Sequence, residues 1–134
     1  MGRRGVRDER GAAAVEFAIV LPILVVVLFA ITSFGIALSR THAYYSAARE
    51  AARYAAVHCR PEAITCDNGL IASRVTATAN GNPIGPGSPA ASLNCTANAG
   101  QLVTVSWSQA IPVQIPLLPD MSFTTDISGT FRCE

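Results

Sequence analysis

Hydrophobic and polar positions form three successive patterns along this chain. An uncharged, strongly apolar stretch covers residues 17–39, and helix-forming residues rich in alanine continue it to about residue 57. After Pro61 the chain is rich in Thr, Ser, Asn, Gly and Pro, and from about residue 102 apolar and polar positions alternate. Because alternation with a period of two is typical of strands, the sequence predicts an α+β protein. We expect a long N-terminal helix followed by a small antiparallel β-sheet domain.

The apolar stretch is long enough to cross a membrane. A helix needs roughly 20 apolar residues to span a hydrocarbon core of about 30 Å, and residues 17–39 supply 23. A removable secretory signal, the alternative, has a shorter apolar region of about 7–15 residues. We therefore expect a single-pass transmembrane helix at 17–39. Pro22 lies within it, and since proline removes one backbone hydrogen bond, we expect a helix kink there.

The charges beside this stretch predict its orientation. The leader at residues 1–11 carries four arginines, whereas Arg40 is the one arginine between the apolar stretch and Arg49. Arginine and lysine near a membrane span favour the cytoplasmic side. We expect a single-pass inner (cytoplasmic) membrane protein with a basic cytoplasmic leader and an extracytoplasmic domain at 58–134. The formal net charge of +1 gives no indication of a nucleic-acid partner.

The junction between leader and apolar stretch has the form of a prepilin-peptidase cleavage site. Gly11 ends the leader, small apolar residues begin at Ala12, and Glu16 and Phe17 open the apolar stretch. Cleavage after Gly11 would leave a long helix at 12–57 in which Glu16 complements the positive end of the helix dipole. A carboxylate at membrane depth is a functional candidate. The alternative is that Glu16 lies among the lipid head groups and only caps the helix.

Small residues recur at helical spacing beyond the apolar stretch. They form two neighbouring stripes, Ala47, Ala51 and Ala55 on one and Ala48 and Ala52 on the next. Small residues at this spacing let another backbone approach closely. Two surfaces could use this close-packing face, the chain's own sheet or the helices of other subunits.

The N-terminal features together resemble the TadE-like family, the minor pilins or pseudopilins of the tight-adherence (Flp pilus) system. The resemblance covers about residues 10–57, and one departure is Ser33, where many members of that family carry an acidic residue. The matching motifs are Val15-Glu16-Phe17, Leu21-Pro22, Phe34-Gly35 and the Ala-Arg-Glu-Ala-Ala-Arg-Tyr-Ala run at 48–55.

The resemblance implies a minor pilin-like subunit, processed by a prepilin peptidase, that takes part in assembly of a tight-adherence/Flp-type pilus. It implies four partners: the membrane, the prepilin peptidase, other pilin-like subunits and the pilus assembly machinery. Glu16 is then the candidate assembly contact, and the subunit could enter the surface pilus. The alternative is a membrane-anchored extracytoplasmic binding or scaffold module that is not incorporated into a filament.

Catalysis is not expected from this sequence. His42 and His58 have no credible nucleophile with an orienting acid beside them. The glycines of residues 81–89 do not precede a helix as those of a phosphate-binding loop do. We expect no enzyme activity, no cofactor, no resident metal and no small-molecule substrate.

Six further segments are predicted after residue 58. A short helix is expected at about 67–79, because Asp67 or Thr65 can cap it, and a loop at 81–89, which holds three Pro and three Gly. Strands are expected at about 92–96, 102–109 and 121–133, the first two joined by a hairpin turn. The proline-rich run at 111–119 is expected to be a sheet edge or a crossing segment.

Four cysteines, Cys59, Cys66, Cys95 and Cys133, lie on the expected extracytoplasmic side, where disulfides are allowed. Three pairings are formally possible, and we expect Cys59–Cys66 and Cys95–Cys133 to staple the domain. The alternative is a metal site formed by His58, Cys59 and Cys66. Its spacing lacks the paired C-x2-C arrangement of structural zinc sites.

Overall fold

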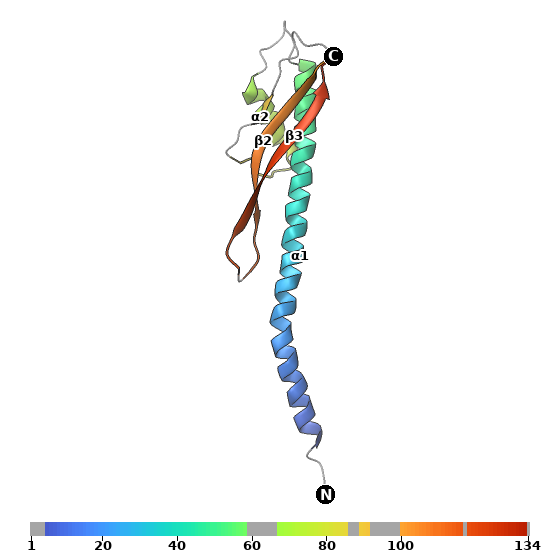
Figure 1. Ribbon diagram of the computed structural model, residues 1–134, viewed down its shortest axis with the longest axis vertical. Helices are drawn as coiled ribbons and strands as arrows, with labels where there is room; N and C mark the ends of the chain where they lie inside the picture. Colours follow the sequence, from blue (N-terminus) through green and yellow to red (C-terminus); the bar gives the residue numbers. More distant parts are fainter. Residues whose placement is uncertain (1–4, 59–66, 86–88, 92–99, 117, 134) are drawn as a thin grey trace.

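A computed structural model describes residues 5–58, 67–85, 89–91, 100–116 and 118–133 of the 134-residue chain. In chain order, its elements are α1 (Gly5–His58), α2 (Asn68–Thr78), β1 (Ala90–Ala91), β2 (Leu102–Val113) and β3 (Met121–Arg132). Figure 1 shows α1 as a long rod with α2 and the sheet packed beside its C-terminal half. The expected combination of a long helix and a small antiparallel sheet is confirmed.

Helix α1 is 54 residues long, which corresponds to about 81 Å at about 1.5 Å per residue. It begins at Gly5, within the basic leader and earlier than the expected Ala12. Pro22 lies inside it without ending it, and Figure 1 shows a continuous, gently curved rod rather than a sharp bend. A proline is tolerated inside a long helix when local adjustments satisfy the freed carbonyl.

The sheet has the order β1-β2-β3, and both of its pairings are antiparallel. Strands β2 and β3 pair along their full lengths, from Leu102 opposite Arg132 to Val113 opposite Met121. The sequence prediction ended the first of these strands at 109, but β2 continues through Pro112. Strand β1 pairs only with residues 105 and 106, so no described strand flanks β2 at Pro112 on the side away from β3. A proline without an N–H is accepted at such an edge.

Two predictions in the sheet region fall wholly or partly outside the described residues. The strand expected at 92–96 and its hairpin turn are not described, and β1 lies immediately before them at Ala90–Ala91.

Helix α2 covers Asn68–Thr78, close to the expected 67–79. Asp67 is its N-cap, and the Asp67 carboxylate accepts a hydrogen bond of 2.9 Å from the Gly69 N–H.

The core lies where α1, α2 and the inner face of the sheet meet. Ile71 and Val75 of α2 are buried, whereas Leu70 is 40% exposed because it lies on the neighbouring side of the helix. Buried and exposed positions alternate along β2 and from Ile127 to Phe131 of β3, as the sequence pattern predicted, whereas residues 121–124 of β3 are all exposed. The core residues of the two strands are Val103, Val105, Trp107, Ile111 and Ile127.

Candidate membrane and assembly surface of helix α1

The N-terminal half of α1 carries large apolar side chains that the chain itself does not cover. Every described side chain from residue 11 to 36 is exposed or half-exposed, and Phe17 and Ile31 are 63% and 66% exposed. Among the described residues, α1 is the one helix long and apolar enough to cross a membrane. A continuous apolar surface of this size marks contact with lipid or with another protein.

The four residues of the cleavage motif lie on this uncovered surface. Gly11, Ala12, Glu16 and Phe17 are all helical and exposed, and a Cβ added at Gly11 would meet nothing within 4 Å. Among the side chains that the structure describes, Glu16 has no ion-pair partner, since the one ion pair found joins Arg53 and Glu50. The carboxylate of Glu16 is therefore accessible to another molecule.

The alanine stripes of α1 are sealed into the chain's own domain. Ala47, Ala48, Ala51, Ala52 and Ala55 are each 0% exposed, and the backbone of β3 lies close against them. The chain's own domain therefore covers the close-packing face, which the sequence left open to either its own sheet or other subunits.

Gly129 of β3 is the point of closest approach to α1. A Cβ built at Gly129 would lie 2.5 Å from the carbonyl oxygen of Ala48 and 2.5 Å from the backbone nitrogen of Arg49. No side chain fits there. The sequence analysis did not single out Gly129, although a glycine within an alternating strand often marks a close backbone approach.

Residues 11–53 match the family model of the TadE-like proteins. The match confirms the resemblance seen in the sequence, and it covers less than half of the chain. No curated protein and no solved structure matches.

The TadE-like segment contains both surfaces of α1, the uncovered apolar one and most of the alanine face. It ends within α1, so α2 and the sheet lie outside it. Within the segment, the Ser33 hydroxyl donates a hydrogen bond to the carbonyl oxygen of Gln114, just after β2. An ionised acidic side chain at this position could not donate that bond.

Gln109 fixes the sheet and the loop after α2 to each other, and the sequence analysis missed it. Its side chain is 3% exposed, on the inward face of β2. The side-chain oxygen accepts hydrogen bonds of 2.8 Å from the Gly85 N–H and 3.2 Å from the Trp107 indole N–H. The side-chain amide donates to the carbonyl oxygens of Ala110 and Pro83 at 3.0 and 3.4 Å. The sequence did contain a signal, because the alternation along this strand predicts an apolar residue at the position that Gln109 occupies.

Tyr44 links the TadE-like segment to this network. Its hydroxyl donates a hydrogen bond of 2.8 Å to the Pro83 carbonyl, and its ring meets that of Trp107 edge to face at 6.5 Å between centroids. Burial raises the pKa of the Tyr44 phenol from its ordinary value, against the smaller opposing effect of the Arg40 charge.

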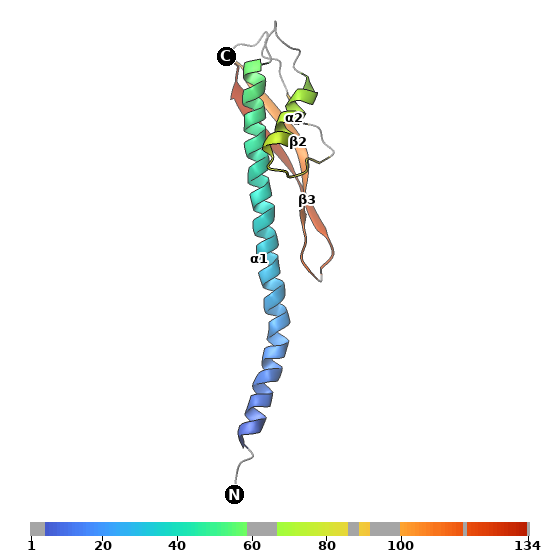
Figure 2. The same ribbon diagram turned by 180° about the vertical axis from the view of Figure 1, so that it is seen from behind.

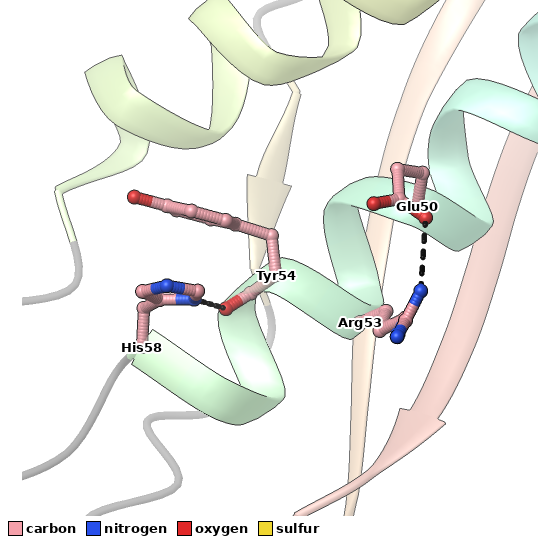
Figure 3. Close-up of polar contacts among 4 residues, drawn as sticks. All are labelled: Glu50, Arg53, Tyr54 and His58. Atoms are coloured by element: carbon pink, nitrogen blue, oxygen red, sulfur yellow. Dashed lines mark hydrogen bonds and ion pairs between the residues drawn. The ribbon is translucent and has the colours of Figure 1, made fainter.

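Polar and aromatic side chains gather on the exposed side of the last turns of α1, as Figure 3 shows. Glu50 and Arg53 form an ion pair of 3.9 Å, and the rings of Tyr54 and His58 stack at 4.1 Å between centroids. The guanidinium of Arg74 lies 4.4 Å from the centre of the Tyr54 ring. The contact between Arg74 and Tyr54 joins α2 to α1 at the surface, whereas the other two lie within α1.

The histidines and cysteines take no catalytic or metal-binding arrangement in the described part of the chain. His42 and His58 are both exposed, and the described residues hold no group of three or more His, Cys, Asp or Glu that could bind a metal ion. Cys133 is 2% exposed, and no free cysteine is found among the described residues. Cys59, Cys66 and Cys95 lie outside the described residues, so both disulfide pairings and the alternative metal site stay predictions.

Proposed function

We propose that this protein is a minor pilin-like (pseudopilin) subunit that takes part in assembly of a tight-adherence, Flp-type pilus. The observation that carries the proposal is the TadE-like match on a helix with one half uncovered and the other half sealed. The C-terminal half of α1 packs into a folded domain, while the apolar surface of the N-terminal half contacts lipid first and other pilin-like subunits afterwards. The subunit acts by assembly rather than by catalysis.

Before assembly, the uncovered half of α1 spans the inner membrane. The basic leader lies on the cytoplasmic side, and α2 and the sheet lie on the other side, in line with the arginine distribution. In that oxidising compartment, the pairs Cys59–Cys66 and Cys95–Cys133 close as disulfides. Each typically contributes about 2–4 kcal/mol, a large share for so small a domain.

A prepilin peptidase then cleaves after Gly11. Cleavage removes four arginines and two acidic residues, which lowers the formal net charge from +1 to −1 (+1 − 4 + 2 = −1). The loss of these arginines removes the charges that hold the N-terminus at the cytoplasmic face. Glu16 then lies one turn from the new N-terminus, where its carboxylate is placed to pair with the α-amino group of a neighbouring subunit.

The experiment that tests this proposal is N-terminal sequencing of the protein recovered from its native membrane. We expect a chain that begins at Ala12, and we expect a Gly11→Leu variant to retain its leader. Gly35→Leu is the matched control, because an added Cβ at Gly11 or at Gly35 meets nothing within 4 Å. A wild-type chain that begins at Met1 or Gly2 would instead favour the membrane-anchored binding or scaffold module.

A further inference from the structure

The end of the β2–β3 hairpin, residues 113–116 and 118–123, lies beside the apolar half of α1; we call it the hairpin end. Figures 1 and 2 show the hairpin extending past α2 and running down alongside α1. Ser33 of α1 donates a hydrogen bond to the Gln114 carbonyl, which joins the two segments. Between them is an apolar cleft of about 660 Å³, lined mainly by Ala30, Ile31, Phe34, Val113, Ile115 and Phe123.

The hairpin end itself exposes large apolar side chains. Leu118, Met121 and Phe123 are 47%, 49% and 42% exposed. They continue the exposed apolar surface of α1 onto a second element, since the same cleft joins Phe123 and Met121 to Ile31 and Phe34. An apolar patch shared by two elements needs one common apolar environment.

Part of the backbone of the hairpin end is hydrogen-bonded within the chain. Strand pairing continues to Val113 opposite Met121, and the Leu118 N–H donates to the Ile115 carbonyl at 3.1 Å. Pro116 and Pro119 have no N–H to satisfy. Each backbone group paired in this way lowers the cost of bringing non-helical backbone towards the apolar part of a bilayer.

The position of the hairpin end along α1 indicates which environment covers it. Phe34 lies five residues before the end of the expected 17–39 span, or about 8 Å along the helix at about 1.5 Å per residue. A hairpin end that packs beside residues 30–34 is therefore below the membrane surface on the side of the folded domain.

We propose that the hairpin end inserts into the outer leaflet beside α1 and that lipid acyl chains fill the cleft between them. The inference rests on the proposed function, because it requires α1 to span the membrane. The carboxylate of Asp120, exposed at the same end, keeps the insertion shallow, since a charge in hydrocarbon is costly. The insertion holds the folded domain against the membrane at a fixed level until the subunit leaves it.

The test uses the full chain in vesicles of phosphatidylethanolamine and phosphatidylglycerol with brominated acyl chains, which quench tryptophan at membrane depth. Three variants each add one tryptophan: Leu118→Trp at the hairpin end, Phe29→Trp in the span and Ser106→Trp on the exposed face of β2. The native Trp107 is 5% exposed and supplies the same background in all three. We expect Leu118→Trp to lose clearly more emission than the parent, though less than the deeper Phe29→Trp, and Ser106→Trp to lose no more than the parent.

The remaining outcomes separate this inference from the proposal on which it rests. Quenching of Phe29→Trp without quenching of Leu118→Trp would overturn the lipid contact and leave the membrane helix standing. Absence of quenching in Phe29→Trp would overturn both. A blue-shifted but unquenched Leu118→Trp at high lipid dilution would mean that a second copy of the chain covers the cleft, which also overturns the lipid contact.

Discussion

The two halves of α1 differ in the side chains that they present and in whether the chain itself covers them. The N-terminal half presents large apolar side chains such as Phe17 and Ile31, more than 60% exposed, while the C-terminal half presents alanines that are 0% exposed. Small side chains let the backbone of β3 approach the helix at Gly129. Large side chains would prevent that approach, but they suit a fluid or adaptable neighbour.

The energetic consequence differs between the halves. Removing a Val, Leu, Ile or Phe side chain from water stabilises by about 1.5–3 kcal/mol, and the N-terminal half leaves many such side chains without cover from the chain. The alanine half has little apolar area per residue, so it depends on close packing and on satisfied polar groups around it. Substitutions that disturb packing or buried hydrogen bonds should therefore act strongly in one half and weakly in the other.

The sharpest test of this difference adds one methyl group to each surface. Gly129→Ala places a Cβ against the backbone of Ala48 and Arg49, which cannot yield as a flexible side chain can. We expect the free energy of unfolding to fall by about 3 kcal/mol or more, at or above the upper end of typical overpacking costs. Urea unfolding in detergent micelles, followed by the fluorescence of Trp107, measures it.

The matched control is Gly35→Ala in the uncovered half, where an added Cβ meets nothing within 4 Å. Alanine is a better helix former than glycine by about 1 kcal/mol, so this variant should be unchanged or slightly stabilised. Equal destabilisation by the two substitutions would contradict the division of α1 into a sealed and an uncovered half.

The second test removes the buried amide on which the alanine half depends. Gln109→Leu keeps an apolar side chain of similar size but leaves the Gly85 N–H and the Trp107 indole N–H without their acceptor. A buried donor without a partner costs about 1–3 kcal/mol, and we expect a loss of stability in that range by the same urea assay. Gln101→Leu, at an exposed position, should change little, and a comparable loss there would remove the network as the explanation.

The sequence predicted the elements of this fold better than the contacts between them. The apolar run, the alanine spacing and the alternation after residue 102 each report a local period, and each element is found. Gly129 and Gln109 were missed because their importance depends on what lies opposite them across the sheet and helix. Met121 and Phe123 follow the same alternation as Ile127, but they are 49% and 42% exposed because the hairpin extends past α2.

A smaller effect is expected from the contact that joins α1 to the loop after α2. Tyr44→Phe removes the 2.8 Å hydrogen bond to the Pro83 carbonyl but keeps the ring against Trp107. The net loss should be about 1 kcal/mol at neutral pH. Urea unfolding at pH 7 measures it, and a loss as large as that of Gln109→Leu would contradict the ranking.

The same variant tests how the stability of the protein depends on pH. Burial raises the pKa of Tyr44 above its ordinary value of 10.0, so the folded state keeps a proton that the unfolded state releases. The stability due to this proton is complete below about pH 10 and is lost as the pH rises through the higher folded pKa. The chain has no lysine to titrate in this window. Wild-type stability should therefore fall more steeply than that of Tyr44→Phe above about pH 10, and parallel curves would contradict the assignment to Tyr44.

The smallest effect on stability should come from the ion pair on the solvent-exposed side of the C-terminal half of α1. Glu50 and Arg53 are 52% and 64% exposed and 3.9 Å apart, and exposed pairs of this kind on a helix contribute about 0.3–0.5 kcal/mol. Glu50→Gln should lower stability by no more than that, and 0.5 M NaCl should abolish the difference because salt screens exposed charges. A loss above about 1 kcal/mol that persists in salt would mean that this side of α1 is covered by a further contact. The C-terminal half of α1 would then be covered around its whole circumference rather than along one face.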